Sequence, residues 1–135
     1  MNVRLKDFYK LVKDSITKMQ RNISCYIIGC EEGKYYVGST PDWRVQTRFK
    51  AHRNGTGSKW CQQFPGIRIV KLIENLTSAE GFNQENTECI RILIENNDLQ
   101  CCRGGDILFP LGTVWWVNRY NALIEHFGTQ VLTIS

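Results

Sequence analysis

The chain has 135 residues, enough for one domain with a single buried core. Apolar residues make up 42% and charged residues 22% of it, a balance that excludes both a disordered chain and a membrane-embedded one. Lysine and arginine outnumber aspartate and glutamate by 17 to 13, which permits a polyanionic partner without requiring one.

The N-terminal residues are charged and lack the apolar stretch of a secretory signal, and no apolar run approaches the ~20 residues that span a bilayer. We therefore expect an intracellular protein, in cytoplasm or nucleus, with no membrane partner. The cysteines match no zinc-binding spacing, and in a reducing compartment buried free thiols are expected. They are Cys25, Cys30, Cys61, Cys89, Cys101 and Cys102.

The first predicted element is an amphipathic helix over residues 4–20. Its apolar residues recur at spacings of three and four, which is typical of one helix face. They are Leu5, Phe8, Val12, Ile16 and Met19. We expect this helix to pack against the rest of the domain.

A β-hairpin is predicted next, from residues 22–30 and 35–38 joined by the turn at 31–34. The first segment is rich in β-branched and aromatic residues, and Gly33 suits the turn. Antiparallel pairing would bring Tyr26 of the first strand near Tyr36 of the second. Tyr35 is expected to pack.

A basic helix is predicted from about Trp43 to Arg53, with Thr40 as its cap and Pro41 in its first turn. Residues 44, 48 and 52 are four apart, so Arg44, Arg48 and His52 should share one helix face. Residues 34–53 hold a single acid, Asp42, among several basic residues, and a positive patch is expected there.

The remaining elements complete a small fold. Residues 66–74 suit a third strand, and the capping-box pattern of Thr77 and Glu80 opens a long helix to about Glu95. One more helix is expected within residues 109–127. The prediction is one α/β (α+β) domain over residues 1–135, with a small, mainly antiparallel three-stranded sheet flanked by helices.

Four segments, in this order, resemble the GIY-YIG nuclease family of viral, phage or mobile-element type. They are Ser24-Cys25-Tyr26, Tyr36-Val37-Gly38, Arg48-Phe49-Lys50-Ala51-His52 and Glu80-Gly81-Phe82-Asn83-Gln84-Glu85. The resemblance covers residues 22–96, between an N-terminal helix (1–21) and a C-terminal helical extension (97–135). Ser24 and Cys25 replace the family's Gly and Ile, but only the tyrosine of that tripeptide is expected to do chemistry.

The resemblance implies a metal-dependent endonuclease that hydrolyses DNA phosphodiester bonds. Its catalytic residues would be Tyr26, Tyr36, Arg48, His52 and Glu85. Glu85 would bind Mg²⁺, with Mn²⁺ as a substitute, and Arg48 would hold a non-bridging phosphate oxygen. Glu80 and Glu88 compete for the metal role, although Glu80 already has a capping role at the helix start.

The general base is left between two residues. Tyr26 is the family's first candidate, and a tyrosine needs nearby positive charge to act as a base at neutral pH. His52 is the second candidate, because imidazoles as a class titrate close to neutral pH. Tyr36 would orient the phosphate or the water.

Further residues are expected to contact DNA, either duplex or branched. They are Lys34, Arg44, Arg53, Lys59, Trp60 and Arg103. Trp60 either stacks on a base or belongs to the core, and Arg103, before Gly104-Gly105, belongs either to a turn or to a phosphate contact. An Arg-Gly-Gly segment also follows this domain in some viral and phage-type members. A homodimer is compatible with the sequence.

Two rival functions are considered. A non-catalytic nucleic-acid-binding module would keep the basic helix, but it would gain nothing from the carboxylate of Glu85 beside phosphates. A purely structural domain would make the order of Arg48, His52 and Glu85 a coincidence.

Overall fold

The computed structural model describes residues 4–107, and of residues 13–19 the backbone alone. Its helices and strands are α1 (Leu5–Met19), β1 (Ile23–Cys30), β2 (Tyr35–Pro41), α2 (Val45–Asn54), α3 (Lys59–Gln63), β3 (Gly66–Leu76), α4 (Ser78–Asn96) and β4 (Cys102–Gly104). Short 3₁₀ turns join β1 to β2 (Glu31–Gly33) and β2 to α2 (Asp42–Arg44). The helix expected within residues 109–127 lies outside the described residues.

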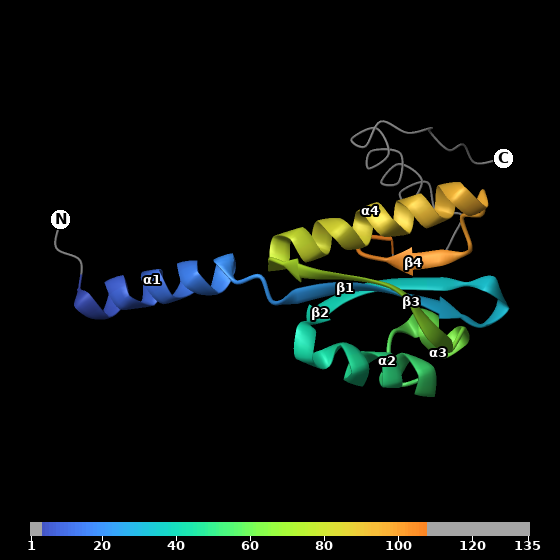
Figure 1. Ribbon diagram of the computed structural model, residues 1–135, viewed down its shortest axis with the longest axis horizontal. Coiled ribbons are helices and arrows are strands. Elements are labelled where there is room, and N and C mark those ends of the chain that lie inside the picture. The colour runs from blue at the N-terminus through green and yellow to red at the C-terminus, as the bar shows by residue number, and fades with distance from the viewer. Residues whose placement is uncertain (1–3, 108–135) are drawn as a thin grey trace.

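The sheet has four strands in the order β3-β1-β2-β4 (Figure 1). β1 pairs antiparallel with both β2 and β3, whereas β4 lies parallel to β2. The predicted three-stranded, mainly antiparallel sheet is therefore corrected to a mixed sheet of four strands. β4 escaped prediction because it is three residues long and contains a glycine, which leaves no strand pattern to recognise.

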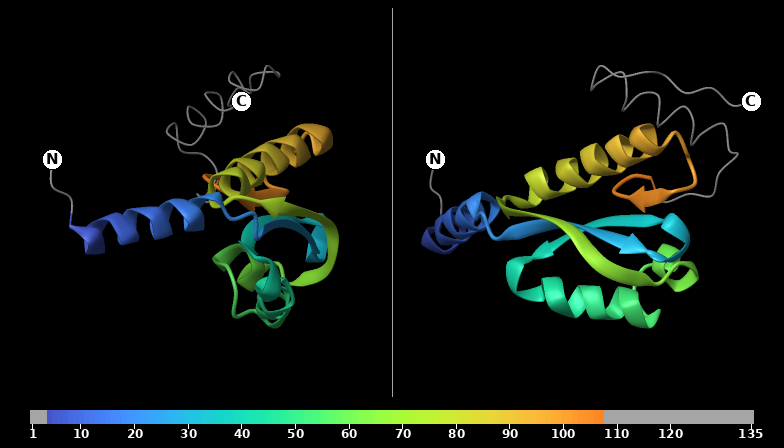
Figure 2. Two further views of the ribbon diagram at one scale, coloured as in Figure 1. Left: turned by 60° about the vertical axis from the view of Figure 1, so that its left-hand side comes forward. Right: turned by 45° about the vertical axis from the view of Figure 1, so that its right-hand side comes forward.

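Helices cover the two faces of this sheet, with α4 on one side and α2 and α3 on the other (Figure 2). β1 is a central strand, so its alternating side chains are buried on both faces. Cys25 and Ile27 pack in the α4 layer, and Tyr26 and Ile28 pack in the layer of α2 and α3. Because helices cover both faces of β1, the strand needs apolar residues on both sides, and this explains its continuous apolar run.

All six cysteines are buried and free, as the sequence predicts for a reducing compartment. Cys25, Cys89, Cys101 and Cys102 belong to the core under α4, and Cys30 and Cys61 belong to the core on the other face. They act there as small apolar side chains.

The long helix and the basic helix begin and end on recognisable local signals. Thr77 Oγ1 accepts from the Glu80 backbone N–H, and Glu80 Oε1 accepts from the Thr77 N–H, which is the predicted capping box of α4. α2 starts after the 3₁₀ turn rather than at Trp43, and it ends at Gly55, whose φ of 77° is left-handed.

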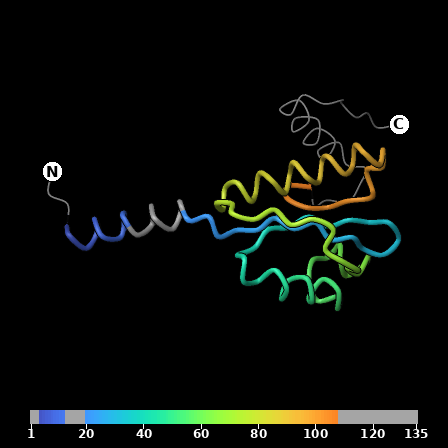
Figure 3. The backbone as a smooth tube through the Cα atoms, in the orientation of Figure 1, coloured from blue at the N-terminus to red at the C-terminus, as the bar shows by residue number. Residues whose placement is uncertain are grey.

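α1 leads away from the sheet at the N-terminal end of the domain (Figures 1 and 3). The expected helix is present, but its described apolar side chains are exposed, including Leu5 at 84% and Phe8 at 57%. The expectation that this helix packs on the domain therefore does not hold for those side chains. Within residues 4–107, no helix is long and apolar enough to cross a membrane.

Candidate active site

The register of β1 against β2 sets two tyrosines on one face of the sheet. Tyr26 lies opposite Gly38 and Ile28 lies opposite Tyr36, so the two phenols are diagonal neighbours with ring centroids 6.4 Å apart. A Cβ atom at position 38 would come 2.5 Å from the Tyr26 hydroxyl. Gly38 therefore leaves the space that the Tyr26 phenol occupies.

Helix α2 brings Arg48 and His52 to the same place. His52 is fully buried, its Nε2 lies 3.1 Å from the hydroxyl oxygen of Tyr26, and its ring centroid lies 4.7 Å from that of Tyr36. The half-buried guanidinium of Arg48 also donates a hydrogen bond to the Tyr26 oxygen. The four-residue spacing on α2 thus aims both side chains at one phenol.

The loop after α2 sets the orientation of the imidazole. The Ser58 backbone N–H donates to His52 Nδ1 over 3.2 Å, and a Cβ at Gly57 would come 2.2 Å from the same nitrogen. Because Nδ1 accepts this bond, the neutral ring carries its proton on Nε2. His52 is then the donor in its contact with Tyr26, and Tyr26 is the acceptor.

Glu85 lies on α4, on the opposite face of the sheet from the two phenols and α2. β4 pairs with β2 only along Tyr35–Val37, so it stops before Gly38 and Ser39. There Ser39 donates to the Glu85 carboxylate from both its hydroxyl and its backbone N–H. The charge of Glu85 acts on both phenols, since it helps to raise the pKa of Tyr26 and of Tyr36.

Burial is the main influence on the acid–base state of the two phenols. It raises the pKa of Tyr26, as does the neighbouring Tyr36, whereas the hydrogen bond and the charge of Arg48 lower it. The pKa of Tyr36 is raised first by burial and then by Glu85, against the opposing effects of Arg48 and Ser58. In the protein without metal or substrate, both phenols are therefore protonated at neutral pH.

Burial also dominates at Glu85, where it raises the pKa to about 7. The two hydrogen bonds from Ser39 favour the ionised form, and the nearby negative charge of Asp106 disfavours it. Glu85 thus changes its charge close to neutral pH. A carboxyl group of this kind suits either proton transfer or the binding of a hard cation.

Glu80 and Glu88, the two other candidates for the metal role, are both paired with other residues of the fold. Glu88 is 4% exposed, and this burial favours its neutral form, but its ion pairs with Arg91 and Lys71 together outweigh the burial and hold the pKa of the carboxyl below its usual value. Glu80 takes part in the capping box and pairs with Arg21. Of the three glutamates, Glu85 is the one whose charge reaches the phenols of both Tyr26 and Tyr36.

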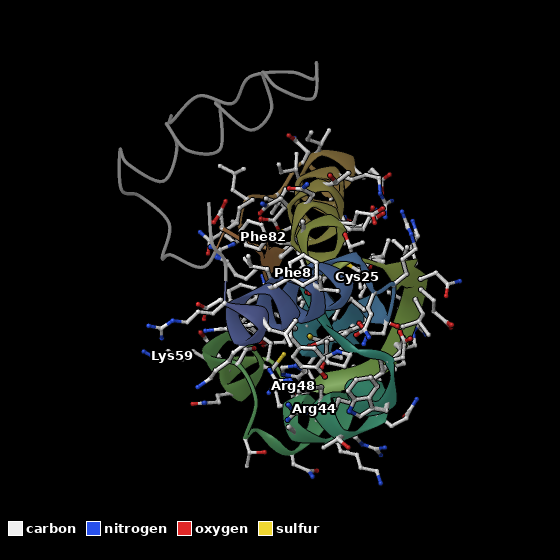
Figure 4. The ribbon with its side chains drawn as sticks, turned by 90° about the vertical axis from the view of Figure 1, so that its left-hand side faces the viewer. Phe8, Cys25, Arg44, Arg48, Lys59 and Phe82 are labelled. Carbon is white, nitrogen blue, oxygen red and sulfur yellow. The ribbon has the colours of Figure 1, made fainter. Side chains whose placement is uncertain are left out.

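The residues expected to contact DNA fall into two groups. Arg44, Arg53 and Lys59 are exposed, and Figure 4 shows Arg44 in the 3₁₀ turn before α2, Arg48 on α2 and Lys59 on the neighbouring α3. Lys34 is half-buried, with its ammonium 5.4 Å from the centroid of the Phe64 ring.

Trp60 and Arg103 form the second group, in which Trp60 is half-buried and Arg103 is buried. The Trp60 indole N–H donates to the Tyr35 carbonyl over 2.9 Å, and the Arg103 guanidinium lies 4.7 Å from the indole centroid. Arg103 is 4% exposed and donates to the carbonyls of Leu99 and Cys102. Arg103 lies in strand β4 and not in a turn, and its side chain is buried, which does not fit an exposed phosphate contact.

Several residues that act on the site could not be predicted from the sequence. Ser39, Ser58 and Asp106 act on site residues through contacts that no motif spacing indicates. Ser24, which replaces the family's glycine, is buried and its hydroxyl donates to Asp42 at the start of the turn before α2. The serine that replaces the family's glycine therefore forms a hydrogen bond close to the site.

Comparison with known proteins decides the family. A family model described as the GIY-YIG catalytic domain matches residues 22–96, more than half of the chain. The chain belongs to the GIY-YIG family. This GIY-YIG match spans both tyrosine strands, the basic helix and the part of α4 that carries Glu85.

Curated relatives match a shorter stretch. A UPF0213 protein of Xanthomonas campestris pv. campestris is 36% identical over 45 residues, which cover 33% of this chain and 42% of the relative. UPF0213 protein XAC3202 of Xanthomonas axonopodis pv. citri gives the same identity and coverage. The chain thus spans less than half the length of these relatives, and no solved structure matches it significantly.

Proposed function

We propose that this GIY-YIG protein is a divalent-metal-dependent endonuclease that hydrolyses DNA phosphodiester bonds. The observation that supports it most is the convergence of a phenol, a guanidinium, an imidazole and a carboxylate, from β1, α2 and α4, within the family-matched region. These groups can bind a phosphate, place a water and carry the charge that develops during hydrolysis.

Arg48 is the group that would hold the scissile phosphate. Its guanidinium is always protonated, and its planar fork can donate two hydrogen bonds to phosphate oxygens. It is half-buried beside Tyr26, so a phosphate held by it would also lie beside the phenols. Tyr36, which remains protonated, would donate its hydroxyl proton to the phosphate or to the attacking water.

Glu85 is the proposed ligand of the metal. Its part-exposed carboxylate matches the preference of Mg²⁺ for oxygen ligands, and Mn²⁺ takes the same donors. Among the described residues, no three His, Cys, Asp or Glu side chains gather into a metal-binding cluster. When bound, the cation would supply charge stabilisation to the phosphate and the leaving 3′ oxygen.

Tyr26 is the group we assign to water activation, with His52 as its positioning residue. Because burial keeps the phenol protonated in the free protein, this role requires that the positive charge of Arg48 and of a bound cation lower its pKa when the site is loaded. His52 Nε2–H and Arg48 both donate to the Tyr26 oxygen, and two such donors stabilise a phenolate. The bond from Ser58 fixes His52 in this donating form, so the structure supports Tyr26 over His52 as the base.

DNA is the proposed substrate, and the exposed Arg44, Arg53 and Lys59 would neutralise its backbone beside the site. These contacts go to phosphates and carry no sequence information directly. We therefore expect weakly specific or structure-selective cleavage of duplex or branched DNA.

Supercoiled plasmid tests the proposal. The purified protein should nick it in Mg²⁺ or Mn²⁺ and should fail to do so in excess EDTA. Nicking that persists in EDTA would overturn the metal-dependent mechanism. A fluorescence-anisotropy titration with labelled duplex DNA should run beside it, because binding without nicking in any divalent metal would favour the non-catalytic binding module.

A further inference from the structure

Ser58 is the last residue of the loop between α2 and α3, and it caps the second of these helices. Its Oγ accepts from the Cys61 backbone N–H over 3.1 Å, which satisfies one of the free N–H groups at the start of α3. The Ser58 hydroxyl is therefore held in place by the helix that it caps.

Ser58 also contacts the candidate active site, through both its backbone and its side chain. Its backbone N–H donates to His52 Nδ1 over 3.2 Å, and the centroid of the His52 ring lies 4.7 Å from that of Tyr36. The Ser58 hydroxyl forms a hydrogen bond with the Tyr36 hydroxyl. One loop residue thus bonds an imidazole and a phenol that lie against each other.

The direction of the bond between the two hydroxyls follows from the other partner of Ser58. Because the Cys61 N–H donates to Ser58 Oγ, the proton of the Ser58 hydroxyl is left to be donated to the Tyr36 oxygen. Burial raises the pKa of Tyr36 and the bond from Ser58 opposes this, as expected for a donor that stabilises the phenolate. The proton of the half-buried Tyr36 then points away from Ser58.

We propose that Ser58 is a positioning residue of the site, whose hydroxyl holds the Tyr36 oxygen so that the Tyr36 proton is directed at the scissile phosphate or the attacking water. The inference rests on the role proposed for Tyr36 in DNA hydrolysis. Without the donor at position 58, the Tyr36 hydroxyl could rotate and turn its proton away from the substrate. The loop that orients His52 would in this way orient Tyr36 as well.

The hydrogen bond is tested first in the protein without metal or DNA. The full chain is labelled with tyrosine carrying ¹³C at Cζ, and the Tyr36 resonance is assigned by its loss in Tyr36→Phe. Ser58→Ala should shift the Tyr36 resonance at neutral pH and move its titration to higher pH, because the donor is gone. Ser58→Thr keeps a hydroxyl and should restore the wild-type signal. An unchanged Tyr36 signal in Ser58→Ala would overturn the proposal.

Plasmid nicking tests the use of this bond. Ser58→Ala should lower kcat by about tenfold and leave KM unchanged, since the bond orients a reacting group and holds no DNA. Thr77→Ala is the matched control, because it removes the cap of α4 as Ser58→Ala removes that of α3. At equal concentrations of folded protein, Thr77→Ala should keep the wild-type kcat. An equal loss of kcat in the two variants would reduce Ser58 to a helix cap.

A double-mutant cycle separates positioning from stability. If Ser58 acts through Tyr36, adding Ser58→Ala to Tyr36→Phe should lower the melting temperature without lowering kcat further. Additive losses of kcat would overturn the proposal. A wild-type protein that shows the expected Tyr36 signal but nicks no DNA in any divalent metal would overturn the endonuclease function, and with it the catalytic use of the bond, while confirming the bond itself.

Discussion

The hydroxyl oxygen of Tyr26 and Nε2 of His52 lie 3.1 Å apart inside the protein, and Ser58 bonds the other nitrogen of the ring. The imidazole therefore has a defined direction, with its proton pointing at the phenol oxygen. The pair links the first tyrosine strand to the basic helix, and its hydrogen bond has consequences for both stability and activity.

Tyr26→Phe should lower both the stability of the protein and its nicking activity. The substitution leaves the buried Nε2–H of His52 without its acceptor, which costs about 1–3 kcal/mol of unfolding free energy. It also removes the proposed base, and we expect nicking to fall by about 10²-fold or more. Urea unfolding and single-turnover plasmid nicking measure the two effects.

Tyr35→Phe is the matched control, because Tyr35 packs against the core cluster on the α4 face, away from His52. It should retain nicking at close to the wild-type rate. Equal losses in the two variants would show that Tyr26 acts only through packing.

Gly38→Ala should displace the Tyr26 phenol. The new methyl group would lie 2.5 Å from the Tyr26 hydroxyl, so the ring or the strand must shift, at a cost of about 1–3 kcal/mol. We expect a large loss of nicking with the protein still folded, measured by circular dichroism and plasmid assay.

Gly33→Ala is the comparison for that prediction. No atom lies within 4 Å of a Cβ there, although the left-handed φ of 70° adds strain of about 1 kcal/mol. It should lose stability and keep its activity per folded molecule. If Gly38→Ala were as active as Gly33→Ala, the close fit between Gly38 and Tyr26 would have no catalytic importance.

Glu85→Gln should stabilise the metal-free protein at alkaline pH. A carboxyl whose pKa rises on folding binds its proton more tightly in the folded state, so wild-type stability falls as pH increases from about 4.5 to about 7. At about 1.4 kcal/mol per pH unit, the advantage of the variant should reach about 3 kcal/mol above pH 7 and vanish below pH 4.5.

Urea unfolding in EDTA between pH 4 and pH 9 measures this advantage. Glu95→Gln serves as the control, because the Glu95 carboxylate is exposed on α4 and its advantage should not grow with pH. An advantage of Glu85→Gln that is the same at pH 4 and pH 8 would contradict the perturbed carboxyl group.

Glu88→Gln should lower the stability of the protein at neutral pH, whereas Glu85→Gln should raise it. Glu88 is buried and accepts bonds from Lys71, Gln84 and Arg91, so loss of its charge should cost about 1–2 kcal/mol. The partner cations are part-exposed, which keeps the cost below that of a fully buried pair. Nicking per folded molecule should be unchanged, and a metal-dependent loss would instead identify Glu88 as a ligand.

The sequence predicts the parts of the fold that depend on local pattern. The apolar run around Tyr26, the four-residue spacing of Arg48 and His52, and the capping box before Glu85 each define an element and a face. Their order along the chain is also what identifies the family. Strand β4 is too short to have such a pattern, so the sheet was predicted one strand too small.

The contacts that complete the site are long-range and have no periodic signal. The bond from Ser39 to Glu85 depends on where β4 stops, and the bond from Ser58 to His52 depends on a loop conformation. Arg103 looks like a surface cation in the sequence, yet Trp60 and two backbone carbonyls hold it inside the fold. Such placements follow from tertiary packing, which spacing along one chain does not encode.

The most direct test of the proposed site is the initial rate of plasmid nicking in Mg²⁺ by wild type, Glu85→Gln and Arg48→Ala at equal concentrations of folded protein. We predict metal-dependent nicking by the wild type and a loss of about 10²-fold or more in each variant, as for other groups that stabilise charge in a transition state. Nicking at the wild-type rate by either variant would contradict the proposal that these residues form the phosphodiester-cleaving site.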